Sequence, residues 1–184
     1  MTIETQRLLL RPFTEDDAED VFEYLETPAV NCFADMKLHS PEEARAEMKK
    51  RAGETENYFA VVLKDSGKVI GEIGAYPDPG HGEEDPVRDT YSPIWMLNRA
   101  YHGKGYAYEA ARALFDCLFR EKGARRIYAY TEDYNLPCQR LCERLGMRRE
   151  GVFVEFVSFV NGPDGSPIYE NTIQYAILKK EWAQ

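Results

Sequence analysis

The chain has 184 residues, 43% of them hydrophobic and 30% charged, a composition typical of a folded globular domain rather than a disordered or fibrous chain. Its 23 basic and 32 acidic residues give a formal net charge of −9, which disfavours non-specific nucleic-acid binding and favours cationic partners. No apolar run approaches the ~18 residues of a membrane span. Because the first residues also lack the pattern of a signal peptide, we expect a cytoplasmic protein without membrane contact.

The cysteines form no CxxC pair, and only three histidines accompany them. Zinc sites need clustered thiolate and imidazole ligands, so we expect no metal site and four reduced thiols.

The first half of the chain predicts a strand, two helices and a hairpin. Residues 8–10 read as a strand that ends at Pro12, after which Thr14 caps a helix with an acidic first turn. The run Ser40-Pro41-Glu42-Glu43 combines an N-cap, a first-turn proline and a capping-box glutamate, so a second helix starts there and ends near residue 53. Two β-rich runs, residues 58–63 and 69–76, flank a turn at 65–67 and predict a hairpin.

The second half alternates strands and helices after a long loop at residues 77–90. The pattern predicts strands at 92–98, 126–131, 152–160 and 172–178, and helices at 105–122 and 136–145. The resulting order, β-α-α-β-β-β-α-β-α-β-β, predicts an α/β fold with one mixed sheet and helices on both faces, within a single domain of residues 1–184.

A glycine-rich turn connects the strand at 92–98 to the long helix that follows. Gly103 and Gly105 let an anionic group approach the backbone, Lys104 adds a positive charge, and the first N–H groups of the helix lack internal partners. The turn therefore predicts a phosphate or pyrophosphate site. It has no Walker pattern, and Tyr108 stands where the dinucleotide fingerprint needs its third glycine.

Four blocks in this sequence resemble the GNAT N-acetyltransferases, in that family's order. His102-x-x-Gly105-x-Ala107 resembles the acyl-CoA signature Q/R-x-x-G-x-G/A, with histidine in place of Gln or Arg. The opening ETQRLLLRPF (residues 4–13), the segment NLPCQRLCERLGM (135–147) and the closing YAIL followed by EW (175–182) resemble the RimJ/RimL branch of the family.

The resemblance implies a GNAT-like fold, with a mostly antiparallel sheet that splays open between two strands, and acetyl-CoA in the gap. The strand would pair with the pantetheine arm, and the turn would hold the pyrophosphate. The implied cofactor-binding residues are Met96, Leu97, Asn98, His102, Gly103, Lys104, Gly105, Tyr106, Ala107 and Asn135.

Direct attack of an amine on the thioester needs a proton acceptor and benefits from an acid near the thiolate. Glu72 is a candidate base, although a strand glutamate is commonly only an exposed side chain. Ser92 lies where relatives often carry an acidic residue, and a water chain is the alternative to a dedicated base there. Cys138 stands where the branch usually has serine and is a candidate acid or a small packing residue. Glu155 is a further candidate carboxylate for the cleft.

We therefore expect an acetyl-CoA-dependent N-acetyltransferase that acts on a primary amine, either a small molecule or a protein N-terminus. The alternatives are a catalytically silent acyl-CoA-binding or sensing domain, motivated by Ser92 and Cys138, and a simple scaffold protein, which would leave the turn without a role. A homodimer is possible, but no stripe in the sequence marks its interface.

Overall fold

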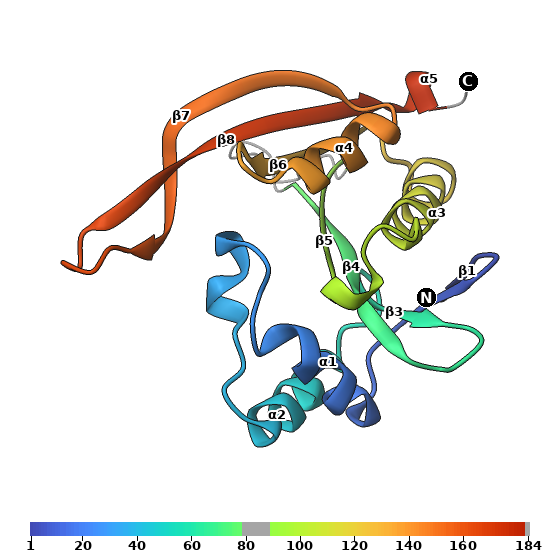
Figure 1. The fold of residues 1–184 in the computed structure, drawn as a ribbon. Coiled ribbons are helices and arrows are strands. Elements are labelled where there is room, and N and C mark those ends of the chain that lie inside the picture. The colour runs from blue at the N-terminus through green and yellow to red at the C-terminus, as the bar shows by residue number, and fades with distance from the viewer. Residues whose placement is uncertain (79–88, 183–184) are drawn as a thin grey trace, which may run out of the picture. The chain divides into compact units, whose positions relative to one another are not determined.

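The computed structural model describes residues 1–78 and 89–182, which divide into two compact units. The first unit holds residues 1–74 and 95–113, and the second holds residues 75–94 and 114–184 as far as they are described. Strands β4 (Val69–Pro77) and β5 (Thr90–Leu97) and helix α3 (Tyr106–Arg120) run from one unit into the other. The elements are drawn in Figure 1.

In the first unit the strand order is β1-β2-β3-β4-β5, with antiparallel pairing from β1 through β4. Besides β4 and β5, its strands are β1 (Ile3–Glu4), β2 (Leu8–Arg11) and β3 (Tyr58–Leu63). Its helices are η1 (Glu15–Asp17), α1 (Ala18–Leu25), η2 (Asn31–Met36), α2 (Pro41–Arg51), η3 (Arg99–Tyr101) and the start of α3.

In the second unit the strand order is β5-β6-β8-β7. Its elements are β6 (Arg126–Glu132), α4 (Leu136–Arg144), β7 (Arg148–Asn161), β8 (Pro167–Leu178) and α5 (Lys179–Trp182). Strands β6, β8 and β7 pair antiparallel, whereas β5 and β6 are parallel and share only two register pairs, Thr90 with Arg126 and Tyr91 with Ile127. The short ladder agrees with strands that diverge after their first residues.

Local capping explains where the helices begin. Thr14 and Asp17 form a capping box ahead of α1, and the Ser40 hydroxyl accepts from the Glu43 N–H at the start of α2. Asn135 caps α4 in the same way through the Cys138 N–H. The two cores consist of large side chains with almost no exposure, among them Leu8, Leu25, Met48, Phe59 and Ile70 in the first unit, and Phe115, Phe119, Ile127 and Tyr175 in the second.

The α/β class and the mixed, mostly antiparallel sheet are confirmed. The order of main helices and strands also agrees with the sequence patterns, and residues 58–63 form β3 with the predicted bounds. The sequence missed β1, the first five residues of β8, and α5, whose Trp182 packs against the rings of Phe115 and Phe119. In the described part of the chain, no helix is long and apolar enough to cross a membrane.

Candidate functional site

The end of β5 leads through η3 into α3, and hydrogen bonds of Asn98 fix the first bend. The Asn98 side chain accepts from the Ala100 N–H at 3.0 Å and donates to Glu23 Oε2 at 3.2 Å, while its own N–H donates to the Ile70 carbonyl. Asn98 is 9% exposed. The Asn98 carbonyl also accepts from the Tyr101 N–H at 2.9 Å, so the side chain and the backbone of Asn98 both shape the chain reversal.

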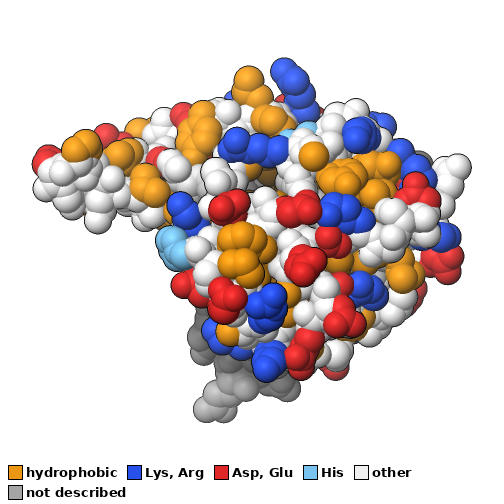
Figure 2. Space-filling view, turned by 60° about the horizontal axis from the view of Figure 1, so that its bottom comes forward, with side chains coloured by type: hydrophobic (Ala, Val, Ile, Leu, Met, Phe, Trp, Pro, Cys, Tyr) orange, Lys and Arg blue, Asp and Glu red, His pale blue; other side chains and the backbone are white. Residues whose placement is uncertain are grey.

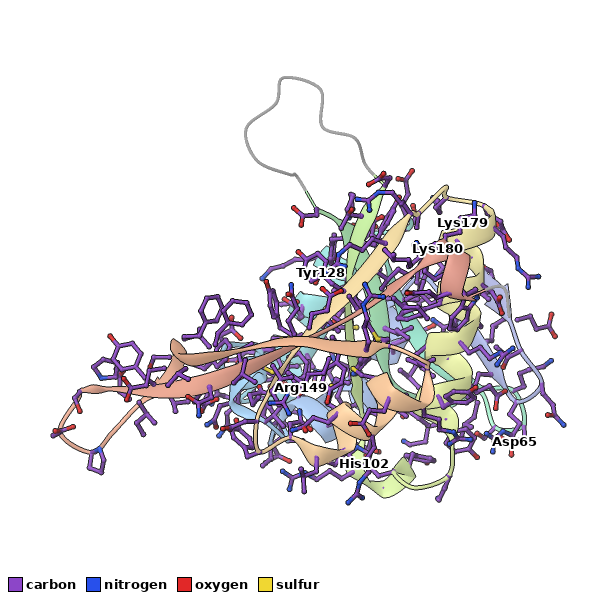
Figure 3. All side chains as sticks on the ribbon, turned by 90° about the horizontal axis from the view of Figure 1, so that it is seen from above. Asp65, His102, Tyr128, Arg149, Lys179 and Lys180 are labelled. Atoms are coloured by element: carbon purple, nitrogen blue, oxygen red, sulfur yellow. The ribbon has the colours of Figure 1, made fainter. Side chains whose placement is uncertain are left out.

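A hydrogen bond of His102 stabilises the turn, and two glycines in it have positive φ. His102 Nε2 donates to the Leu97 carbonyl at 2.9 Å, which ties the turn to the end of β5 (Figure 3). Gly103 and Gly105 have φ of +74° and +83°, values that L side chains rarely adopt. A Cβ at Gly103 would meet nothing within 4 Å, so the backbone there is open to an approaching group.

The first turn of α3 supplies the donors for that group. The first four backbone N–H groups of a helix have no partner within it, and the helix dipole is positive at this end. Lys104 adds a cation, with its Nζ 5.0 Å from the centroid of the Tyr101 ring. The open glycine backbone, the helix N-terminus and the lysine together fit a pyrophosphate group.

Arg7 braces this turn from the N-terminal segment. Its guanidinium donates to the Lys104 carbonyl at 3.1 Å and to Glu109 Oε2 at 2.7 Å, and it lies 4.4 Å from the centroid of the Tyr106 ring. Burial alone would raise the pKa of Glu109, but hydrogen bonds from Thr5 and Arg7 outweigh it and hold that pKa below the usual value. Glu109, the acidic residue in the first turn of α3, is thus ionised and paired with Arg7, so its negative charge is balanced near the place where an anion would bind.

The predicted cofactor residues from Met96 to Ala107 lie together in the first unit, in one strand-turn-helix segment. Met96 and Leu97 are 5% and 8% exposed. Strand β4 approaches them closely, because a Cβ on Gly71 would lie 2.3 Å from the Met96 carbonyl oxygen. Asn135, the remaining predicted cofactor residue, belongs to the second unit.

Glu72 lies on β4 with no exposed surface, surrounded by donors from three other elements. Its carboxylate accepts from Tyr58 at 2.6 Å, from Tyr24 at 2.9 Å and from Arg51 at 2.5 Å. Burial, followed by the charge of Glu72, raises the pKa of Tyr24 well above its usual value. A carboxylate held by two phenols and a guanidinium stabilises the packing of α1 and α2, and its role as a base stays a prediction.

Ser92, on β5, hydrogen-bonds to Tyr128 of β6 within the second unit. The Tyr128 hydroxyl in turn donates to Asp78 Oδ2 at 2.9 Å. Burial and then the bond to Asp78 raise the pKa of Tyr128 to about 12. Sequence reasoning found no carboxylate beside Ser92, because Asp78 is 14 residues away along the chain. The fold brings Asp78 close, since its N–H donates to the Thr90 carbonyl on β5 and its carboxylate accepts from Tyr128.

A second carboxylate that the sequence analysis missed, Glu132, ends β6 and is 4% exposed. Its Oε2 accepts from Asn135 Nδ2 at 3.1 Å. Its Oε1 is a buried side-chain oxygen without a hydrogen-bond partner in the described part of the chain. Gln139 donates to the Glu132 carbonyl at 3.3 Å, so the end of β6 is fixed to the start of α4. A buried carboxylate oxygen in this state is ready to accept from a bound donor.

Cys138 lies in the first turn of α4, where its N–H donates to the capping Asn135 at 3.3 Å. Its thiol is half-buried and hydrogen-bonds to the thiol of Cys142, one turn later. That bond and burial raise the pKa of Cys142, which is fully buried. The four cysteines are free, and the described residues hold no group of metal-ligating side chains. Most of the loop predicted at residues 77–90, with His81 and the acidic run 83–85, lies outside the described residues.

Comparisons with known proteins show which family this chain resembles in sequence and fold. The family model described as Acetyltransferase (GNAT) domain matches residues 7–148. A Bacillus subtilis protein, described as the uncharacterized N-acetyltransferase YnaD, is 35% identical over 182 residues and 99% of both chains. A GNAT-family acetyltransferase structure from Bacillus anthracis has a TM-score of 0.82 at 31% identity, covering 98% of this chain and 100% of that one. A Vibrio cholerae structure, described as a ribosomal-protein-serine acetyltransferase, shares the fold at TM-score 0.72 and 22% identity over 97% of both chains.

Proposed function

Because the chain belongs to the GNAT family and is an N-acetyltransferase, we propose that it transfers the acetyl group of acetyl-CoA to a primary amine, by direct attack in a ternary complex. We place it in the RimJ/RimL-like branch, on the resemblance of its opening residues 4–13 and its closing segment 175–182. Acetyl-CoA supplies the activated thioester carbonyl. The residues of this chain bind the cofactor, orient the amine acceptor and accept its proton.

The observation that carries the proposal is the turn between β5 and α3. Gly103 leaves its backbone uncovered, Gly105 gives it a second positive φ, and His102 fixes it to β5. The α3 N-terminus and Lys104 supply positive potential. This arrangement suits the pyrophosphate of coenzyme A. On the family resemblance, the strand Met96-Leu97-Asn98 would pair with the pantetheine arm, and Asn135 would be a further cofactor contact.

Deprotonation of the amine is assigned to the Ser92–Tyr128–Asp78 chain. Tyr128 stays protonated at neutral pH because its pKa is about 12. Its hydroxyl oxygen can therefore accept a proton from the Ser92 side only while it transfers its own proton to Asp78. Hydrogen-bond chains of this kind move a proton without a carboxylate in contact with the substrate. Glu72 remains the alternative base, and Cys138 is the proposed acid for the departing thiolate.

A cationic acceptor agrees with the charges of this protein. The net charge of −9 favours approach of ammonium groups, and Glu132 Oε1 is a buried acceptor in need of a donor. The acceptor is either a small amine or the α-amine of a protein, and the Vibrio cholerae relative is described as acting on a ribosomal protein.

The first experiment is a calorimetric titration with acetyl-CoA, using two glycine variants matched in backbone strain. Gly103 and Gly67 both have φ of +74° and nothing within 4 Å of a built Cβ, but Gly67 lies in the β3–β4 turn. We expect one-to-one micromolar binding that Gly103→Val abolishes and Gly67→Val preserves. Equal affinity of both variants for acetyl-CoA would show that the turn is not the cofactor site.

Acetyl transfer is then measured as release of the CoA thiol in the presence of amines. Release with a primary amine supports the full proposal. Binding without release for small amines, polyamines and N-terminal peptides would favour the silent acyl-CoA-binding domain.

A further inference from the structure

One group of charged side chains in the first unit connects α1 with the start of β4. The Lys68 ammonium donates to Asp20 Oδ1 at 2.7 Å and to Glu23 Oε1 at 2.9 Å. Asp20 Oδ2 also accepts from the Val69 N–H at 2.8 Å. Asp20 and Glu23 are three residues apart on α1, so their side chains lie on the same side of the helix. A single ammonium group therefore holds two carboxylates of α1.

The contact between Lys68 and Glu23, taken by itself, is an ordinary surface ion pair. Acidic and basic side chains lie next to one another over the face in Figure 2, and exposed pairs of this kind contribute little to stability. The side chain of Glu23 is 51% exposed. Burial would lower the pKa of Lys68, but its bonds to Asp20 and Glu23 outweigh burial and raise that pKa above its usual value. Lys68 thus stays an ammonium ion that restrains the Glu23 carboxylate.

The second oxygen of Glu23 makes this pair different, because it contacts the turn between β5 and α3 (residues 98–105, the cofactor turn). Glu23 Oε2 accepts from Asn98 Nδ2 at 3.2 Å, across 75 residues of the chain. Asn98 is buried, and its Oδ1 accepts from the Ala100 N–H at 3.0 Å. In the described part of the chain, Glu23 is the only acceptor for this amide. The two bonds involve both ends of the amide and so determine its orientation.

A second hydrogen bond holds the cofactor turn from the residues that follow α1. The Arg99 guanidinium donates to the Ala29 carbonyl at 3.3 Å. Asn98 and Arg99, which are neighbours, are thus both bonded to the segment of residues 23–29. They begin η3, which leads directly to His102 and Gly103. The position of the open glycine backbone therefore depends on α1 and the residues after it.

Loss of the Glu23 carboxylate would leave the buried amide of Asn98 without an acceptor. A buried donor without a partner carries a desolvation cost, which is relieved when the group moves toward water. Such a movement would take Asn98 Oδ1 away from the Ala100 N–H and loosen η3. We therefore expect the effect in the order of the cofactor turn rather than in the packing of the core.

We propose that Glu23 is a positioning residue for the cofactor turn. Held by Lys68, it fixes the Asn98 amide, and the amide fixes η3 and the open backbone at Gly103, where the pyrophosphate of acetyl-CoA would bind. Glu23 acts through Asn98 and needs no contact with the cofactor. The proposal rests on the proposed function for the identity of that cofactor, whereas the effect of Glu23 on the turn is measurable without any ligand.

The first test is amide hydrogen exchange of residues 98–105 in the whole protein without ligand. We expect Glu23→Ala to speed exchange in this segment roughly 3- to 10-fold, the effect of one hydrogen bond. Glu19→Ala is the matched control, because Glu19 is an exposed carboxylate on the same helix whose side chain has no hydrogen bond or ion pair within the described residues. Equal exchange in the two variants would overturn the proposal.

The second test exchanges donor and acceptor between the two positions. Asn98→Asp places two carboxylates against each other and should weaken acetyl-CoA binding, measured by calorimetry, roughly tenfold or more. Adding Glu23→Gln supplies a donor for the new carboxylate, which can still accept from the Ala100 N–H, and restores the net charge of the parent. The double variant should bind acetyl-CoA within about threefold of the parent. A double variant as weak as Asn98→Asp alone would contradict the proposal.

Failure of the proposed function gives a different pattern of results. A parent protein that binds no acetyl-CoA would refute the cofactor assignment, and the exchange of residues 98–105 would still decide whether Glu23 orders the turn. A parent that binds acetyl-CoA no better than Glu23→Ala would keep the cofactor site and overturn the positioning role. Weaker binding in Glu23→Ala together with an unchanged kcat at saturating acetyl-CoA supports both.

Discussion

The guanidinium of Arg7 and the carboxylate of Glu109 lie 2.7 Å apart, although 102 residues separate them in the chain. Arg7 thereby joins the segment before β2 to the first turn of α3, and its second contact, with the Lys104 carbonyl, reaches the turn itself. The opening block that resembles the RimJ/RimL branch thus has a structural task, which is to support the proposed pyrophosphate site and neutralise the acid beside it.

Arg7→Ala is expected to weaken acetyl-CoA binding. Charged hydrogen bonds contribute about 1.5–3 kcal/mol, so the dissociation constant should rise roughly tenfold or more, measured by calorimetry. Adding Glu109→Gln to this variant removes the unpaired carboxylate and should recover part of the affinity. Lys64→Ala, which removes an ion pair with Glu4, is the control and should leave binding unchanged. An Arg7→Ala variant with parent affinity would contradict this account of the brace.

Glu72→Gln is expected to destabilise the protein whatever its effect on turnover. The change leaves the guanidinium of Arg51 buried without its main countercharge, which costs about 3–5 kcal/mol in comparable buried pairs. The free energy of unfolding is measured by denaturant titration, with Glu47→Gln as a control at the more exposed partner of Arg51. If stability is kept while kcat collapses, Glu72 is the base and the structural account is wrong.

The ion pair of Asp17 and Arg11 should make stability depend on acid pH. Burial alone would raise the pKa of Asp17, but the Arg11 and Thr14 hydrogen bonds hold it below its usual 3.8. The pair therefore stabilises the fold fully above the unfolded pKa, and this contribution is lost as the pH falls through the lower folded pKa. Asp17→Asn should reduce the free energy of unfolding by about 1–3 kcal/mol at pH 7. The difference from the parent should shrink below about pH 3, and a constant difference down to pH 2 would rule out this linkage.

Tyr128→Phe tests the proposed proton route. The variant keeps the ring but breaks the link between Ser92 and Asp78, so kcat should fall roughly 10- to 100-fold with the acetyl-CoA dissociation constant unchanged. Tyr130→Phe, two residues along β6, is the control and should retain kcat. Equal rates for the two variants would show that the proton leaves by another path.

Cys138→Ala distinguishes the two possible roles of Cys138, a catalytic acid and a packing residue. An acid for the thiolate predicts a fall in kcat of roughly tenfold or more without loss of acetyl-CoA affinity. A hydroxyl can also donate, so Cys138→Ser should keep more activity than Cys138→Ala. Cys32→Ala, a change at a half-buried thiol in the first unit, is the control. Unchanged kcat in Cys138→Ala would assign this thiol to packing against Cys142.

The sequence by itself determined the class of fold, most of the helices and strands, and the turn from Asn98 to Gly105. Those features depend on local signals, namely apolar periodicity, caps such as Ser40, and glycines at positive φ, all of which can be read from neighbouring residues. The tertiary structure decided which groups meet. It enclosed Glu72 among Tyr24, Tyr58 and Arg51, and it connected Ser92 to Asp78 through Tyr128. Such contacts join residues far apart in the chain and follow from strand order and register, which no local pattern encodes. A bulge of β7 at Glu155 has the same origin, because only the pairing of β7 with β8 shows that Phe153 and Phe156 share a face.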